Sequence, residues 1–135
     1  MAPDAEPDAL EKIRDLSRKD GRYSPEAYVF LFRGLDRILK NPPRGKAPGH
    51  VSGKELLAGI RELALEEFGY LARTVFESWG VRATRDFGEA VFVLVNAGLM
   101  GKTEQDRVED FDEVFDFEAA FEKGFTVDWS KVKNA

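Results

Sequence analysis

The chain of 135 residues lacks cysteine entirely and contains a single histidine, His50. Without cysteine it can form no disulfide, no thiol nucleophile and no cysteine-ligated zinc site, and such a composition is typical of a reducing compartment. No apolar run approaches the ~20 residues that cross a bilayer, and the opening MAPDAEPDA lacks the basic and apolar regions of a signal peptide. We therefore expect a cytoplasmic protein.

The length predicts one globular domain over residues 8–125, preceded by a disordered N-terminus over residues 1–7 and followed by a C-terminal tail over residues 126–135. A folded chain of this size buries roughly two-thirds of the surface that its unfolded form exposes, so it needs no disulfide or metal to be stable. No internal repeat and no low-complexity segment interrupts the chain.

The charge of the chain is unevenly distributed, although its formal net value is only −5. Residues 104–118, here called the acidic segment, hold eight acids and one base, a formal charge of −7. Residues 33–54, here called the basic segment, hold six bases and one acid, a formal charge of +5. This separation predicts contacts with charged partners, or docking of one segment on the other within one molecule or between two.

Apolar periodicity predicts two helices in the first third of the chain. The first runs over about residues 8–18 and ends at Gly21, and the second opens at Ser24-Pro25, with serine as the N-cap and proline at the first helical position. Residues 41–49 contain three prolines and two glycines and therefore predict an irregular surface connection.

The middle of the chain carries the clearest helix start. Ser52-Gly-Lys-Glu55 matches a capping box, in which each of the two side chains bonds the backbone N–H of the other residue. The apolar stripe that follows predicts one long helix ending at Gly80, with two helices bent at Gly69 as the alternative.

The remaining third predicts one more buried helix and a mixed C-terminal part. Asp86 is the expected N-cap of a helix that stops at Gly98, although the valine content of this span leaves a strand as the alternative. Residues 99–100 and 114–115 are the expected strands of a short β-hairpin, and Asp116 caps a final helix over residues 117–123. The fold class expected is α+β, mainly α, with about five helices and one hairpin.

An ordered set of short pieces resembles an uncharacterised family of short bacterial proteins found largely in Verrucomicrobia and Planctomycetes. The pieces are Tyr23-Ser-x-Glu26-Ala27-Tyr28-x-Phe30, His50-Val-Ser-Gly-x-Glu-Leu56, Gly59-Ile60-Arg61, Phe68-Gly69, Trp79-Gly80-Val81, Thr84-x-Asp86-Phe87-Gly88, Val91-Phe92, Gly98-Leu99 and Asp110-Phe111. The resemblance covers about Tyr23 to Phe121. It implies a self-contained bacterial domain and brings no activity, cofactor or catalytic residue.

The predicted order of helix, turn, buried helix and hairpin is also similar to a winged helix. The helix that would read DNA, over residues 87–98, contains neither lysine nor arginine, and the wing would be the acidic segment. Because both features oppose contact with phosphate, we expect no DNA binding through such a shape.

Two sets of residues are candidates for binding. Cations beside the start of a helix can attract an anion or a nucleic acid, since helix starts present free N–H groups. The candidate anion-binding residues are Arg44, Lys46, His50, Ser52 and Lys54. The candidate partner-binding residues in the acidic segment are Glu104, Asp106, Glu109, Asp110, Asp112 and Glu113.

No set of nucleophile, base and orienting residue is evident in the sequence, and the acidic segment lacks the residue order of a calcium-binding EF-hand loop. We therefore expect no cofactor and no metal, and favour a non-catalytic protein-binding or regulatory module that acts through a protein partner or through self-association. The alternative is a nucleic-acid, nucleotide or anion-binding protein that uses residues 44–54. A small enzyme with its site around His50 is the third possibility.

Overall fold

The computed structural model describes residues 7–41, 51–101 and 107–123. Its long helices are α1 (Pro7–Asp20), α2 (Pro25–Lys40), α3 (Gly53–Glu67), α4 (Ala72–Ser78) and α5 (Thr84–Asn96). Three short helical turns, η2 (Gly69–Leu71), η3 (Val108–Phe111) and η4 (Glu118–Lys123), complete the described elements. None of these helices combines the length and the apolar composition that crossing a bilayer requires.

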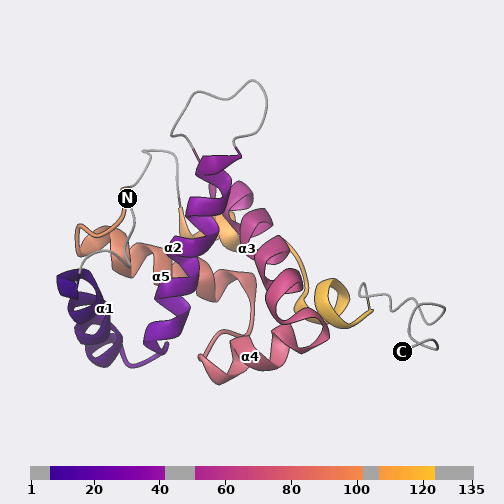
Figure 1. The fold of residues 1–135 in the computed structure, drawn as a ribbon, viewed down its shortest axis with the longest axis horizontal. Helices are drawn as coiled ribbons and strands as arrows, with labels where there is room; N and C mark the ends of the chain where they lie inside the picture. Colours follow the sequence, from indigo (N-terminus) through magenta and orange to yellow (C-terminus); the bar gives the residue numbers. More distant parts are fainter. Residues whose placement is uncertain (1–6, 42–50, 102–106, 124–135) are drawn as a thin grey trace.

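Helix α2 lies at the centre of the fold, with α1 on one side, α3 on the other and α5 crossing it (Figure 1). Helices α2 and α3 approach closely because glycine stands at both contact points. A Cβ atom on Gly34 would lie 2.7 Å from Ile60 Cγ1, and one on Gly59 would lie 2.6 Å from Ile38 Cγ1. The two backbones are therefore packed more tightly than larger residues would permit.

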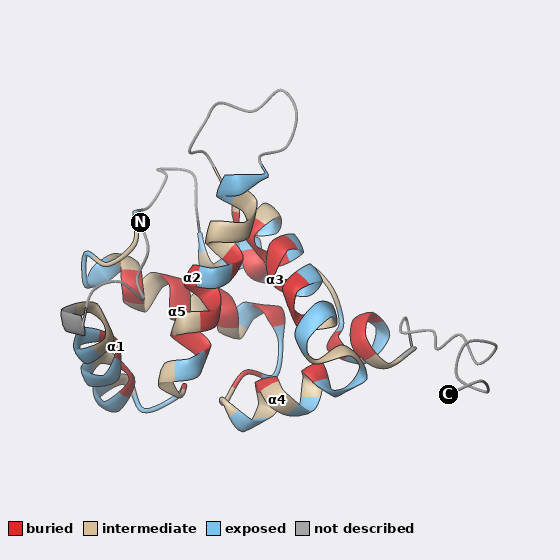
Figure 2. Ribbon diagram, viewed as in Figure 1, coloured by how far each residue is buried: buried red, intermediate tan, exposed pale blue. Residues whose placement is uncertain are grey.

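The hydrophobic core gathers buried side chains from α1 through η4 into one cluster. Figure 2 shows buried positions concentrated on α2, α3 and α5, whereas α1 is mostly exposed. Phe76 of α4 is fully buried and packs against the rings of Phe87, Phe117 and Phe121, with centroids 5.0–5.5 Å apart. This aromatic cluster holds η4 against α4 and α5.

The predicted capping box is confirmed at the start of α3. The Glu55 N–H donates to Ser52 Oγ at 3.2 Å, and the Ser52 N–H donates to Glu55 Oε1 at 3.0 Å. The expected single helix from there to Gly80 is wrong, and the alternative of two helices is the one observed. The chain breaks at Gly69, which has φ +53° and begins η2, so α3 ends before it and α4 starts only at Ala72.

The glycine stops are confirmed, but the start of α5 differs from the prediction. Helix α5 begins at Thr84, and Asp86 occupies the third helical position instead of the N-cap. Its carboxylate accepts hydrogen bonds from the backbone N–H groups of Arg82 and Ala83, at 2.9 and 3.2 Å. From the third helical position, the Asp86 carboxylate therefore accepts hydrogen bonds from backbone N–H groups that precede the helix, as the glutamate of a capping box does.

The predicted β-hairpin is wrong, because the described residues contain helices, turns and bends but no strand. The Leu99 N–H donates to the Leu94 carbonyl at 2.9 Å. This is the 6→1 hydrogen bond of a Schellman motif, in which Gly98 takes the left-handed position at the end of α5. The Val114 N–H donates to Thr84 Oγ1 at 3.2 Å. Since both donors bond elsewhere, residues 99–100 and 114–115 do not form a ladder. The fold is helical rather than α+β. The hairpin that would form the wing of a winged helix is absent from the described residues, so that similarity is not supported.

Candidate protein-binding groove

A groove with an apolar floor lies between α1 and α2 and reaches the end of α4. Its volume is about 330 Å³. We call it the α1–α2 groove, and its lining consists of Leu10, Ile13, Arg14, Pro25, Glu26, Val29, Phe30, Arg33, Phe68 and Trp79. It contains both aromatic rings and charged groups, the combination found at sites that hold an apolar group in a fixed orientation.

Three aromatic rings from three elements form the floor of the groove. Phe30 of α2 lies 5.3 Å from the ring of Trp79 and 5.7 Å from that of Phe68, and the last two rings are 5.9 Å apart. Phe30 is buried, whereas Phe68 and Trp79 are only partly buried. Two of the three rings therefore retain surface that a bound apolar group can cover.

The floor is fixed to the start of α2 by a close crossing of the chain. Gly80 has φ +90° and lies so near residue 22 that a Cβ atom there would overlap the carbonyl oxygen of Arg22. Beside it, the Ser24 N–H donates to the Trp79 carbonyl at 3.0 Å. Only glycine combines this φ with the absence of a side chain, so the sequence Trp79-Gly80 is what brings the end of α4 to the groove.

The outer wall of the groove is α1, and it is attached by few contacts. Among residues 9–20 of α1, only Ile13, which is 1% exposed, and Ser17, which is 8% exposed, are buried. The Ser17 hydroxyl donates to the Tyr23 carbonyl at 2.6 Å. The adjacent Tyr23 hydroxyl donates to Asp86 at 2.8 Å, and burial together with this bond raises the pKa of Tyr23.

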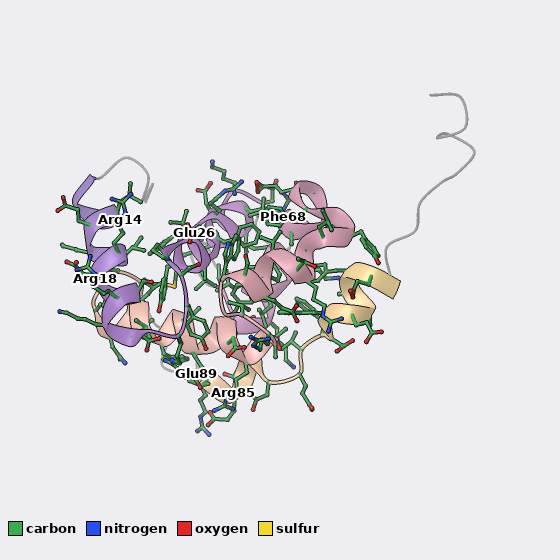
Figure 3. All side chains as sticks on the ribbon, turned by 90° about the horizontal axis from the view of Figure 1, so that it is seen from below. Arg14, Arg18, Glu26, Phe68, Arg85 and Glu89 are labelled. Carbon is green, nitrogen blue, oxygen red and sulfur yellow. The ribbon has the colours of Figure 1, made fainter. Side chains whose placement is uncertain are left out.

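The edges of the groove carry charges of opposite sign. Figure 3 shows Arg14 and Arg18 on α1, with Glu26 between them and Phe68. Within the described residues, Arg14 and Glu26 form no ion pair, and Arg18 approaches Asp15 only at 3.6 Å. Arg33, by contrast, is paired with Glu67. A ligand in the groove thus meets an available cation on one side and an available carboxylate on the other.

The candidate anion site is divided between described and undescribed parts of the chain. Arg44, Lys46 and His50 lie outside the described residues. Ser52 is engaged in the capping box, so its hydroxyl and its N–H already have partners, and Lys54, two residues later, is exposed. The Glu55 carboxylate occupies the position where an anion would approach this helix start. Anion binding by residues 44–54 stays a prediction.

The described part of the acidic segment is pinned to the core by Phe111. This ring is 2% exposed and lies against two glycines, Gly53 of α3 and Gly88 of α5, where a Cβ atom would approach it to 2.9 and 2.6 Å. The Thr84 hydroxyl donates to the Phe111 carbonyl at 2.5 Å. Residues 107–112 of the acidic segment are therefore held as a surface turn by one buried ring and one threonine, while Phe117 anchors the other end of the segment in the aromatic cluster.

The acidic side chains on this turn are exposed, and the ion pair that Asp112 makes is with α5. Asp112 accepts from Arg85 of α5 at 2.8 Å, while Asp110 bonds the Arg107 N–H at 2.9 Å. Glu109 and Glu113 are exposed. Glu104 and Asp106 lie outside the described residues. Arg33 and Arg37 of the basic segment pair instead with glutamates of α3.

The sequence carries no local signal for the groove, because Phe30 continues the apolar period of the helix that opens at Ser24-Pro25, and Phe68 and Trp79 continue that of the helix that opens at Ser52. Only the separation of α1 from α4 leaves Phe68 and Trp79 partly open. Elsewhere in residues 7–41, 51–101 and 107–123, no three acidic or histidine side chains gather as a metal site would require. Comparisons of the chain with known protein families, with curated proteins and with solved structures found no match.

Proposed function

We propose that this chain is a non-catalytic protein-binding module that holds an apolar side chain or pair of side chains of its partner in the α1–α2 groove. One observation carries the proposal: a partly open aromatic floor lies between an available arginine and an available glutamate. The cysteine-free composition supports a cytoplasmic setting for such a module.

The chemistry of the groove specifies its ligand. The rings of Phe68 and Trp79 favour a large aliphatic or aromatic anchor, because burial of such a group releases the most apolar surface from water. Arg14 favours an acidic residue on the α1 side of that anchor, and Glu26 favours a basic residue on the other side. A protein segment that presents an apolar anchor between an acid and a base meets these requirements.

The test uses Trp79 as an internal reporter. The chain has two tryptophans, so a Trp129→Phe background leaves Trp79 as the only one. The probes are synthetic helical peptides of about four turns with Leu and Phe anchors, a Glu cluster at one end and a Lys cluster at the other. A matched peptide replaces both anchors by Ser. We expect saturable blue-shifting of the Trp79 emission by the anchored peptide and none by the Ser peptide.

A charge reversal at the edge of the groove is the matched variant. Arg14→Glu should weaken binding of the anchored peptide about tenfold, the change expected from roughly 1.4 kcal/mol, without changing the thermal midpoint. If no anchored peptide alters the Trp79 emission, the groove does not bind protein segments and the proposal is wrong.

A further inference from the structure

Two adjacent apolar side chains are exposed on the turn that follows α3. Tyr70 and Leu71 of η2 are each 58% exposed, and the only other large apolar side chain classed as exposed among the described residues is Leu39, at 41%. We call Tyr70 and Leu71 the 70–71 pair. A single exposed apolar side chain is ordinary, whereas two adjacent ones leave a patch that contact can cover. Neither residue lines the α1–α2 groove, so the pair is separate from the site proposed above.

The turn that carries the 70–71 pair is closed by backbone hydrogen bonds. Gly69 adopts φ +53°, and the Leu71 N–H donates to the Phe68 carbonyl at 3.0 Å. The Ala72 N–H donates to the Gly69 carbonyl. Because the backbone is already ordered, covering the pair costs little further conformational entropy on this side of the contact.

The last described element, η4, lies against the same turn. It contacts both η2 and α4, and Figure 1 shows it in yellow beside the end of α3. Phe121 of η4 is fully buried, with its ring centroid 5.5 Å from that of Phe76, and Glu122 pairs with Arg73 of α4 at 3.0 Å. Both contacts hold η4 in place. The chain therefore continues beyond Lys123 from an element that touches the turn of the 70–71 pair.

The sequence beyond η4 has an alternating apolar pattern. Residues 124–135 lie outside the described residues, and apolar positions alternate with polar ones over Phe125-Thr-Val-Asp-Trp129-Ser. In an extended chain, side chains two positions apart share a face, so this sequence gives one face with Phe125, Val127 and Trp129. Trp129 is six residues beyond Lys123, an extended reach of about 20 Å. All three side chains can therefore reach the neighbouring turn.

We propose that residues 125–129 dock in extended form on the 70–71 pair of the same chain. The apolar face of this segment then covers the Tyr70 ring and the Leu71 side chain, and the polar face meets water. A tryptophan ring packed on a tyrosine and a leucine removes apolar surface of both partners from water, which is the driving force of the contact.

The size of the exposed patch favours the same chain over a second copy as the source of the segment. Two side chains offer far less than the ~800 Å² per partner that a stable interface between separate molecules buries. A segment tethered a few residues away has an effective concentration in the millimolar range, so a contact too weak to hold two molecules together is still formed within one.

The absence of cysteine permits a direct test, because a single introduced cysteine is the only thiol of the chain. A nitroxide spin label attached to Ser130→Cys broadens the NMR signals of amides close to it. In the full chain we expect the strongest broadening in the described residues at 69–72. Amide signals of α2 and α3 at unchanged positions show that the labelled chain is folded.

Substitutions on both sides of the contact separate docking from mere tethering. Val127→Ser with Trp129→Ser removes the apolar face, and we expect the broadening at 69–72 to fall at least about threefold, because the docked population is lost while the tether stays. Asp128→Asn, on the opposite face, is the matched control and should change nothing. On the other side, Leu71→Ser should reduce the broadening, whereas Leu39→Ser should not.

Three results would overturn the proposal. The first is broadening at 69–72 that is the same with and without the apolar face of the segment. The second is broadening concentrated at Leu10 and Val29, which would place the segment in the α1–α2 groove. The third comes from mixing spin-labelled chains with unlabelled, ¹⁵N-enriched ones: broadening of the enriched chains would show that the segment docks on a second copy.

Discussion

Helix α2 meets two of its neighbours, α3 and α1, in different ways. Toward α3, two glycines allow close backbone contact, and Arg33 and Arg37 pair with glutamates across the outer edge. Toward α1, the contact is reduced to Ile13, Ser17 and their immediate surroundings, and a groove remains. The difference shows that α2 is packed tightly on one side, whereas apolar surface stays accessible in a groove on the other.

The largest effect is expected from filling the α2–α3 contact. Gly59→Val places new atoms where a Cβ alone would lie 3.0 Å from the Gly34 carbonyl oxygen, so the helices must separate. We expect a loss of about 3 kcal/mol of unfolding free energy in urea titration. Gly101→Ala is the control, because a Cβ there has no atom within 4 Å. Equal midpoints for the two variants would show that the α2–α3 contact is not tight.

Truncation of the α1 contact should cost less and should act locally. Ile13→Ala removes the main apolar anchor of α1, and we expect a loss of about 2 kcal/mol, at the lower end for such changes, since the adjacent groove lets the site relax. Hydrogen exchange should accelerate in α1 while the amides of α2 and α3 stay protected. Acceleration throughout α3 would contradict the division between the two sides.

A third substitution tests the buried polar group near the α1 end of α2. The Tyr28 hydroxyl is buried and has no hydrogen-bond partner among the described residues. Tyr28→Phe should therefore stabilise the fold by up to about 1 kcal/mol at neutral pH. Destabilisation measured by urea titration would show that the hydroxyl is satisfied.

The same residue predicts a pH dependence. Burial raises the pKa of Tyr28 to about 12, whereas in the unfolded chain it titrates near ~10. The folded state therefore holds the Tyr28 proton more tightly than the unfolded chain does. The stability that this difference provides is fully present below pH ~10, and the free energy of unfolding falls as pH rises toward 12, because the unfolded chain ionises first. The stability gap between Tyr28→Phe and the unsubstituted chain should widen across that range, and a constant gap would contradict the assignment.

The smallest effect is expected at the outer edge of the α2–α3 contact. Arg37→Met removes pairs to Glu62 at 3.2 Å and Glu66 at 2.6 Å, in which both glutamates are exposed and the arginine is partly buried. We expect a slight decrease in the melting temperature at low salt that disappears near 1 M salt, where screening acts over ~3 Å. A salt-independent decrease would assign the effect to packing of the arginine stem.

Sequence patterns predicted the helix ends best, because those signals are local. Ser52 with Glu55 identified the start of α3, and Gly80 and Gly98 identified two stops, since each acts on backbone groups within one turn. The break at Gly69 was left open because glycine in an apolar stripe permits either continuation or a turn. The hairpin failed because the partner of the Val114 N–H is Thr84, thirty residues earlier.

The site was less predictable than the fold. Charge patterns drew attention to residues 44–54 and 104–113, much of which lies outside the described residues. The groove depends on how far α1 stands from Trp79, which is a tertiary distance and has no local signal. Arg14 and Glu26 were visible only as ordinary surface charges on two amphipathic helices.

The crossing at Gly80 has a mechanical consequence for any ligand of the groove. Because Arg22 and Ser24 are held against Trp79 and Gly80, the floor and the start of α2 move as one body. Under the proposed function α1 is then the wall that moves, and we expect larger anchors to enter by tilting that helix outward about the turn at Gly21. Selectivity for anchor size would thus be governed by the stiffness of one turn.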